Sequence, residues 1–333
     1  MAETISVKTH NNSYNIELEV NALNSLYKYI DVSRYVFIIT DKNVERLYLE
    51  TVKNQFVFAE SFAIKPGEAS KSFEDLNEIL SYMQSIKLNR NVLVIGLGGG
   101  VVGDIAGLAA SLYLRGVDYL AIPTTTLAQI DSSVGGKVAI NLNGIKNVVG
   151  SFYQPIKVIV DPEVLRTLAL SEYNSGLVEA VKTGLLFDST LFYLFLESNI
   201  KQNETEIIKR SIIAKKNIVE LDERDLGQRQ LLNFGHTLGH AFEAKYGFSH
   251  GQSIMLGMIY TVVNEEIKNN LIKIAKKLDL YYEIQLTEDL YELMLFDKKL
   301  SEDYITMAQV DEVGEGYLEK YPKSHLWEIL NVK

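Results

Sequence analysis

Three of the chain's five histidines fall within fifteen residues, at His236, His240 and His250. Neutral imidazole is the commonest metal ligand and the side chain best suited to proton transfer near neutral pH. His236 and His240 are four residues apart in a segment with helical periodicity, so they share one face of the predicted helix. This spacing is typical of zinc sites, although Thr237 stands where a metalloprotease motif has glutamate. The cluster therefore predicts a metal centre, an anion pocket or a proton relay.

Two charged residues, Glu179 and Lys182, lie on an otherwise apolar predicted helix. Burying them is costly unless they are paired or bind a metal; an exposed helix edge is the alternative interpretation. Further along the chain, Arg229 is suited to bidentate binding of a carboxylate or phosphate, and Lys215 and Asp225 lie just upstream of it. These residues extend the histidine cluster into a candidate site for an anionic ligand.

A glycine-rich segment, residues 96–104, follows a predicted strand and opens a predicted helix. Glycines let backbone N–H groups approach an anion, and the helix N-terminus adds a favourable dipole, so this segment can cradle a pyrophosphate. The usual dinucleotide fingerprint is incomplete, because its third glycine would fall at Val101. A closely packed strand-to-helix turn is the alternative. The threonines at 124–126, after the next predicted strand, favour the binding interpretation.

Segments 131–137 and 141–147 are rich in small and polar residues and contain Lys137, Lys146 and Asn147. Such a group suits the binding of phosphate or carboxylate. For any single lysine a solvated loop is the simpler interpretation; for the group it is weaker, because ordering a loop this rich in glycine and serine costs conformational entropy. We expect both segments to be loops.

The elements that must position these residues change in type along the chain. In the first half, predicted strands at 4–8, 14–20, 36–39, 92–95, 119–122 and 158–160 alternate with helices from 44, over 73–85 and over 101–114. Ser72 and Asp75 form a capping signal for the second of these helices. From about residue 162 the spacing is helical, at 177–186, 191–196, 207–219, 231–246 and 254–271. This order predicts an α/β domain over residues 1–165 and a mostly helical domain over residues 166–333.

Composition excludes several classes of protein. The net charge of −10 argues against a nucleic-acid or acidic-membrane partner, so an anionic substrate must meet a local basic pocket. The absence of cysteine excludes disulfides and thiolate metal sites. Neither a signal peptide nor an apolar stretch of membrane-spanning length is recognisable. We therefore expect a cytoplasmic protein.

Taken together, these segments resemble the 3-dehydroquinate synthase family of sugar phosphate cyclases. The matching motifs occur in the family's order and spacing and span nearly the whole chain; they lie at residues 98–104, 123–125, 131–137, 146–147, 179–182, 233–240 and 297–299. The resemblance implies a Rossmann-like NAD-binding N-terminal domain, a helical metal-binding C-terminal domain and a homodimer. It also implies Zn²⁺ as the metal, with Co²⁺ as an alternative.

The resemblance carries the family's site residues onto this chain by position. The implied metal ligands are Glu179, His236 and His250, which places His240 against the substrate phosphate instead of the metal. The implied NAD contacts are Asp41, Glu68, Lys71, Gly99, Gly100, Val101, Asp104, Thr124, Thr125, Lys146 and Thr167. The implied substrate contacts are Arg115 of the partner subunit, Lys137, Asn147, Lys215, Arg229, Asn233, His240 and Lys299, and the implied catalytic set is Asp131, Lys137, Lys182, Asn233 and His240.

The implied reaction converts 3-deoxy-D-arabino-heptulosonate 7-phosphate to 3-dehydroquinate and phosphate in the shikimate pathway, which leads to the aromatic amino acids. It proceeds by transient oxidation with NAD, phosphate elimination, re-reduction, ring opening and aldol closure. A related cyclase with another sugar phosphate, a metal-dependent polyol dehydrogenase and an inactive binding protein are the alternatives. The chain departs from the family at Gln252 and Asp225, where glutamate is usual, and matches it poorly after Lys299.

Overall fold

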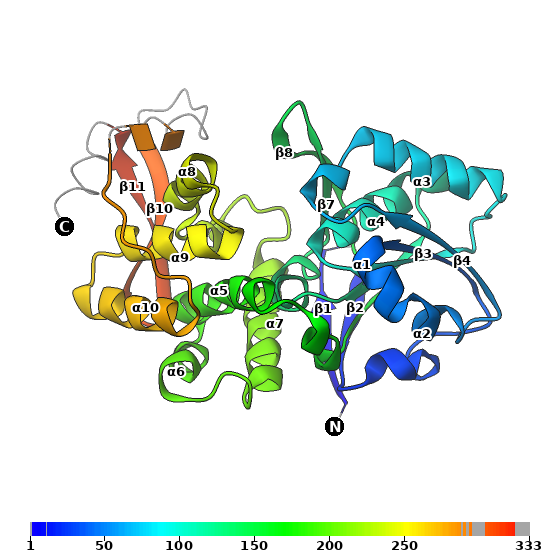
Figure 1. Cartoon of the computed structure of the whole chain (residues 1–333), viewed down its shortest axis with the longest axis horizontal. Helices are drawn as coiled ribbons and strands as arrows, with labels where there is room; N and C mark the ends of the chain where they lie inside the picture. Colours follow the sequence, from blue (N-terminus) through cyan, green and yellow to red (C-terminus); the bar gives the residue numbers. More distant parts are fainter. Residues whose placement is uncertain (1, 11, 288, 291–292, 295–303, 324–333) are drawn as a thin grey trace. The chain divides into compact units, whose positions relative to one another are not determined.

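The computed structural model describes residues 2–10, 12–287, 289–290, 293–294 and 304–323. The chain divides into two compact units, Met1–Leu168 and Ala169–Lys333. The first is an α/β unit and the second is mostly helical, so the predicted fold class is confirmed (Figure 1). Among the described residues, no helix is both long enough and apolar enough to cross a membrane.

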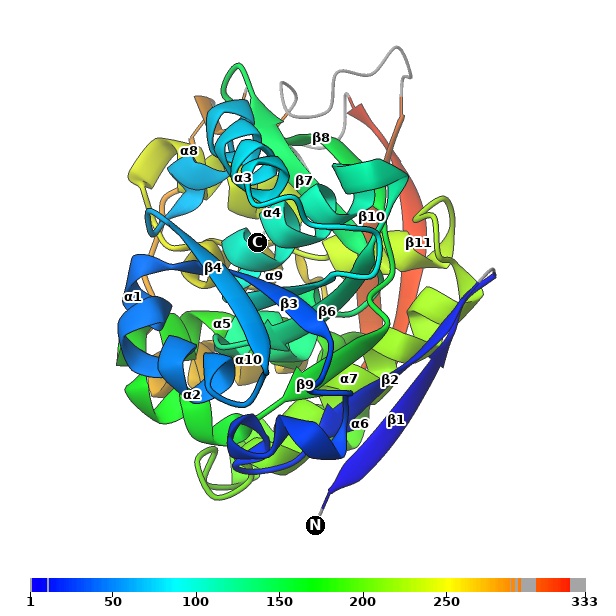
Figure 2. The same cartoon turned by 90° about the vertical axis from the view of Figure 1, so that its right-hand side faces the viewer.

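A seven-stranded sheet forms the centre of the first unit, in the order β1-β2-β9-β6-β5-β3-β4. Strands β1 and β2 form an antiparallel hairpin, and all other neighbours in the sheet are parallel. Figure 2 shows this hairpin at one edge of the sheet and β4 at the other. The strands are β1 (Glu3–Lys8), β2 (Ser13–Leu18), β3 (Tyr35–Asp41), β4 (Phe58–Ile64), β5 (Leu93–Gly98), β6 (Asp118–Pro123) and β9 (Lys157–Val160).

Helices of this unit follow the parallel strands, as the alternating pattern predicts. Helix α3 (Phe73–Ser85) begins after Ser72, whose Oγ accepts a hydrogen bond from the Asp75 backbone N–H at 3.0 Å. Helix α4 (Gly100–Leu112) starts directly after the glycine-rich end of β5. The shorter pieces are α1 (Lys42–Val44), η3 (Glu45–Leu49), α2 (Glu50–Lys53), η1 (Ala22–Asn24), η2 (Leu26–Lys28), η4 (Glu68–Ser70), η5 (Tyr113–Arg115), η6 (Ala128–Ser132) and η7 (Pro162–Thr167).

The core of the sheet is apolar on both faces. Val36 and Ile38 of β3 belong to a buried cluster that includes Leu93 of β5 and Val52 of α2, whereas Phe37, between them in the chain, is also fully buried. This continuous burial is expected of parallel strands covered on both faces. Strand β4 lacked a sequence signal because it is an edge strand with mostly half-buried side chains.

The prediction that segments 131–137 and 141–147 are loops holds for residues 133–136 and is wrong for most of the second segment. Residues 128–132 form a helical turn, η6, and the chain then forms a second antiparallel hairpin of β7 (Lys137–Leu142) and β8 (Ile145–Phe152). Asn143 and Gly144 at its tip have φ values of 51° and 79°, which are typical of a tight hairpin turn. Lys137, Asn143, Lys146 and Asn147, which suggested a loop, are exposed positions of the hairpin.

Helices build the second unit: α5 (Leu170–Phe187), α6 (Ser189–Glu197), α7 (Glu204–Leu221), η8 (Gln228–Asn233), α8 (His236–Tyr246), α9 (His250–Thr261) and α10 (Glu265–Lys277). Two predicted helices are wrong in extent. The segment 231–246 is interrupted at Gly235, where φ is 76°, and the segment 254–271 is interrupted between α9 and α10. A hairpin of β10 (Tyr304–Glu312) and β11 (Glu315–Pro322) was not predicted.

Candidate metal and cofactor sites

Glu179, His236 and His250 bring their ligand atoms together within 4.8 Å in the second unit. Glu179 lies in the middle of α5, and the two histidines are the first residues of α8 and α9. Glu179 Oε1 lies 3.3 Å from His250 Nε2 and 3.8 Å from His236 Nε2. Among the described residues this is the group of His, Asp and Glu side chains with metal-ligand spacing, and His240 is not part of it.

Backbone packing positions these three side chains. The Gly251 backbone N–H donates to Ser175 Oγ at 3.0 Å, which fixes the start of α9 against α5, one turn before Glu179. A Cβ at Gly251 would lie 2.1 Å from the Ser175 carbonyl oxygen, so only glycine permits this approach. At Gly235 the left-handed backbone ends η8 and starts α8, and a Cβ there would lie 2.8 Å from the Ile254 carbonyl oxygen.

The electrostatics of this cluster favours a neutral His236 and an ionised Glu179. Burial, with the nearby Lys182 ammonium, lowers the pKa of His236 well below its ordinary value. Burial raises the pKa of Glu179, but the ion pair with Lys182 and the two imidazoles outweigh it and hold that pKa well below its usual range. Although burial lowers it, hydrogen bonding to the carboxylates of Glu179 and Glu243 raises the pKa of His250 to about 9. The ionised Glu179 carboxylate therefore favours a cation next to its oxygen atoms.

The ring nitrogens of the two histidines are oriented by other groups. His236 Nδ1 lies 3.2 Å from the Phe234 carbonyl oxygen, to which it donates, so Nε2 remains the acceptor atom that faces Glu179. His250 Nδ1 lies 4.0 Å from a carboxylate oxygen of Glu243 on α8. Sequence reasoning missed Glu243. Its spacing was a usable signal, because residues 236, 240 and 243 share one face of a helix.

The other predicted site residues of the second unit differ in their exposure to solvent. His240, one turn into α8, is exposed, and its ring centroid lies 5.5 Å from that of His236. Asn233, at the end of η8, is exposed, whereas Lys215 and Arg229 are buried cations. Arg229 donates to the Glu223 carbonyl oxygen at 2.8 Å.

The glycine-rich turn of the first unit has the form of an anion cradle. Gly99 is the N-cap of α4, and a Cβ there would lie 2.8 Å from Thr125 Cγ2. The Thr124 backbone N–H donates to the Gly98 carbonyl oxygen at 2.9 Å, which joins the ends of β5 and β6. The N–H groups of the first turn of α4 lack intrahelical acceptors, so they are available to a phosphate.

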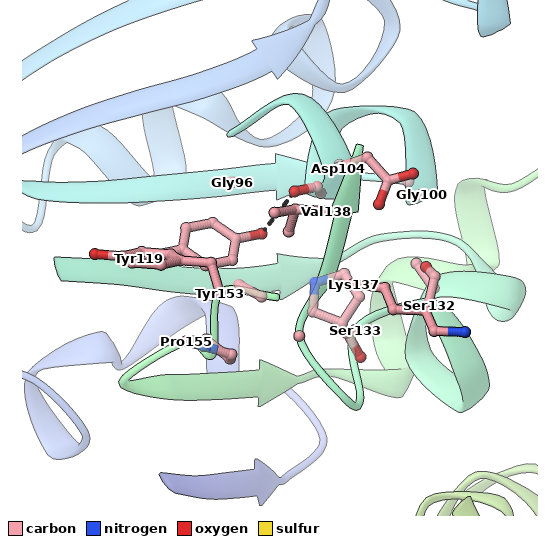
Figure 3. A pocket seen from close by; sticks show the side chains of 17 residues that line it. Gly96, Gly100, Asp104, Tyr119, Ser132, Ser133, Lys137, Val138, Tyr153 and Pro155 are labelled. Atoms are coloured by element: carbon pink, nitrogen blue, oxygen red, sulfur yellow. Dashed lines mark hydrogen bonds between the residues drawn. The ribbon is translucent and has the colours of Figure 1, made fainter. Parts of the chain in front are cut away.

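A pocket opens beside this turn, and Figure 3 shows Gly100, Asp104, Ser132 and Lys137 around it. Tyr119 and Gly103 also line the pocket, and the Tyr119 hydroxyl donates to the Gly103 carbonyl oxygen at 3.1 Å. Burial raises the pKa of Tyr119, so this hydroxyl stays protonated.

Four predicted cofactor and substrate residues form one polar network. Lys71 is 4% exposed, and its ammonium nitrogen lies 2.6 Å from Asp104 Oδ2 and 3.6 Å from Glu68 Oε1. It also donates to Asn147 Oδ1. The structure thus places one buried cation between residues expected to contact NAD and a residue expected to contact phosphate.

The remaining predicted residues lie at strand ends and turns. Asp41 ends β3 and caps α1 by accepting from the Asn43 and Val44 N–H groups, and Thr167 lies 2.7 Å from the Tyr48 hydroxyl. Arg115 is exposed in a turn with φ of 68°. Val101 and Thr125 are half-buried, Asp131 is half-buried in η6, and Lys137 and Lys146 are exposed on the β7–β8 hairpin. Lys299 lies outside the described residues.

Comparison with known proteins tests the resemblance. A family model described as 3-dehydroquinate synthase N-terminal matches residues 61–175, and one described as 3-dehydroquinate synthase C-terminal matches residues 176–300. A 3-dehydroquinate synthase from Clostridium botulinum is 39% identical over 323 residues, 90% of each chain. One from Alkaliphilus metalliredigens is 40% identical over 321 residues, 89% of each chain.

Solved structures agree on the fold. A 2-deoxy-scyllo-inosose synthase complexed with carbaglucose-6-phosphate, NAD⁺ and Co²⁺ is similar, with a TM-score of 0.86, 24% identity and 99% coverage of both chains. At this identity the similarity establishes the fold alone, whereas the sequence relatives establish the family. The resemblance is thereby confirmed, and the chain belongs to the 3-dehydroquinate synthase family.

Proposed function

We propose that this protein converts 3-deoxy-D-arabino-heptulosonate 7-phosphate to 3-dehydroquinate and phosphate, with NAD and a bound divalent metal, in the shikimate pathway in the cytoplasm. The observation that carries the proposal is the Glu179–His236–His250 cluster, in a chain that matches both regions of the family. The proposed assembly is a homodimer in which Arg115 completes the site of the partner subunit.

The donor set of the cluster fits Zn²⁺ or Co²⁺. One carboxylate oxygen and two imidazole nitrogens are ligands that both ions accept, and three protein ligands leave positions open for substrate hydroxyls. When bound by these three residues, a metal ion would supply Lewis-acid assistance to a substrate hydroxyl. Lys182 keeps Glu179 ionised, and the Phe234 carbonyl keeps the His236 Nε2 lone pair facing the ligand group.

The glycine cradle fits the pyrophosphate of NAD, which accepts and returns a hydride in this reaction. We propose that Gly99, Gly100 and Val101 present backbone N–H groups to the pyrophosphate; a Cβ at Gly99 would press against Thr125 and shift this turn. The other proposed cofactor contacts are Asp41, Glu68, Lys71, Asp104, Thr124, Thr125, Lys146 and Thr167.

Basic and amide side chains hold the two anionic ends of the substrate. We assign the carboxylate to Lys215 and Arg229, both buried, because guanidinium binds a carboxylate through two parallel hydrogen bonds. We assign the phosphate to Lys137, Asn147, His240 and Lys299, and Asn233 to the substrate without a specified end. The proposed catalytic set is Asp131, Lys137, Lys182, Asn233 and His240. Local cationic pockets of this kind explain how a chain of net charge −10 binds an anionic substrate.

The test measures phosphate release from the heptulosonate phosphate by purified protein, with NAD, with added Zn²⁺ or Co²⁺, and with a chelator. We expect release that requires NAD and metal, and no net absorbance from NADH, because the hydride is returned. Absence of phosphate release under every condition overturns the assignment. Release from a sugar phosphate lacking the carboxylate indicates a related cyclase, and net NADH from glycerol-like alcohols indicates a polyol dehydrogenase.

A further inference from the structure

Lys71 joins three parts of the first unit through one buried ammonium group. It follows the turn η4, Asp104 lies in the second turn of α4, and Asn147 lies in β8. Burial of a cation is costly unless its protons meet acceptors. The carboxylate of Asp104 and the amide oxygen of Asn147 meet that requirement, and Glu68 adds a second carboxylate at 3.6 Å.

Further hydrogen bonds close a ring around Lys71 and Asn147. The Asn147 backbone N–H donates to Asn141 Oδ1 at 2.8 Å, and Asn141 Nδ2 donates to Glu68 Oε1 at 2.8 Å. The Asn141 backbone N–H donates to the Lys71 carbonyl oxygen at 2.8 Å. The β7–β8 hairpin is therefore tied to the turn that carries Glu68 and Lys71 by side-chain and backbone groups together.

The polarity of the contact determines which end of the Asn147 amide is left for a ligand. An ammonium group only donates hydrogen bonds, so it engages Oδ1 and leaves the two N–H donors of Nδ2 for another acceptor. A phosphate ester offers acceptor oxygens. The oxygen and nitrogen ends of an amide have nearly the same shape, so either end could face a ligand. The contact with Lys71 selects the orientation in which the Asn147 Nδ2 donors face the anion.

We propose that Lys71 is a positioning residue that presents Asn147 to the phosphate group of the substrate and couples this contact to NAD binding through Asp104. The proposal rests on the proposed function for the ligand classes at each end. It assigns Lys71 a role beyond a contact to the cofactor, since the same ammonium group serves both pockets. A ligand that moves the Asp104 carboxylate changes the position of the Lys71 ammonium and therefore its hydrogen bond to Asn147. By thermodynamic linkage, phosphate binding at Asn147 then affects NAD binding by the same factor.

The test uses inorganic phosphate as probe and compares Lys71→Met with Lys65→Met, a matched change at an exposed lysine of the same segment. Calorimetric titration measures phosphate affinity of the metal-loaded dimer with and without NAD. In K71M we expect phosphate affinity to fall about tenfold and to respond less to NAD than in the wild type. K65M keeps wild-type values. In turnover, the KM for the sugar phosphate rises more than kcat falls.

A double-mutant cycle separates positioning from a direct role. If Lys71 acts through Asn147, K71M in an Asn147→Ala background causes little further loss of phosphate affinity. Additive losses, or a K71M protein that binds NAD weakly but phosphate normally, overturn the proposal. If K71M does not fold, Lys71→Arg and N147A provide the same cycle, with thermal unfolding as the check. Phosphate titration needs no turnover, so failure of the proposed reaction is distinguishable from failure of this inference.

Discussion

His250 Nε2 lies 3.3 Å from Glu179 Oε1, although the two residues are 71 positions apart and belong to different helices. His240, only four residues from His236, is absent from the same ligand group. Spatial convergence of α5, α8 and α9, and not proximity in the sequence, thus defines the candidate metal centre.

The first prediction separates the histidines by role. Replacing Glu179 with Gln or His236 with Ala should abolish metal retention, because each removes one of three ligands. His240→Ala should retain metal and lower kcat/KM by about tenfold to a hundredfold, the cost of a lost hydrogen bond to a charged group. Metal content after gel filtration, measured by mass spectrometry, and steady-state kinetics provide the readouts. Equal metal loss in H236A and H240A would contradict this division.

The second prediction concerns Glu243, whose carboxylate lies 4.0 Å from His250 Nδ1. A carboxylate behind a ligating histidine fixes its tautomer and raises its basicity. Glu243→Gln should weaken metal affinity about tenfold, measured by competition with a chelator. Glu266→Gln, a matched change at an exposed position of α10, serves as the control. An unchanged affinity in E243Q would show that Glu243 does not orient the ligand.

The third prediction tests the glycine cradle. In Gly99→Ala the new methyl group would meet Thr125 Cγ2 at 2.8 Å, so the turn must shift. We expect NAD affinity to fall about tenfold in a protein whose thermal unfolding is close to that of the wild type. Thr125→Ser removes Cγ2 and keeps the hydroxyl, so G99A/T125S should recover part of the affinity. No recovery would place the defect elsewhere than in this contact.

The fourth prediction is a pH dependence of stability through Asp222. Its carboxylate is partly desolvated, which raises its pKa, but hydrogen bonds from the N–H groups of Leu226, Gly227 and Arg229 lower that pKa further than desolvation raises it. A group with a lowered folded-state pKa stabilises the protein above its unfolded pKa of about 4, and this contribution is lost as the pH falls through the folded value.

Asp222→Asn should therefore lower the free energy of unfolding at pH 7 by about 1 kcal/mol and have a smaller effect in acid. Urea unfolding at pH 7 and at about pH 3 measures both values. Because Asp222 also holds the backbone of Arg229, the KM of D222N should rise as well. An equal destabilisation at both pH values would exclude the charged carboxylate as the cause.

The sequence alone determined the features that depend on neighbouring residues. The serine cap at Ser72 and the apolar spacing after it predicted helix 73–85 with its observed bounds, because capping and amphipathicity are local. The glycine turn before α4 and the parallel order of strands and helices were also predictable. The linked motifs identified the family, which the comparisons confirm.

Only the tertiary structure decided which side chains meet. Strand β8 looked like a loop because most of its residues are exposed, and exposure removes the apolar alternation that reveals a strand. The helix 231–246 looked continuous because periodicity does not report a single left-handed glycine such as Gly235. The residues alone left the role of His240 open, and the buried position of Lys71 between Asp104 and Asn147 had no sequence signal. Such contacts join residues that are far apart in the chain, so they form only when tertiary packing brings their helices and strands together.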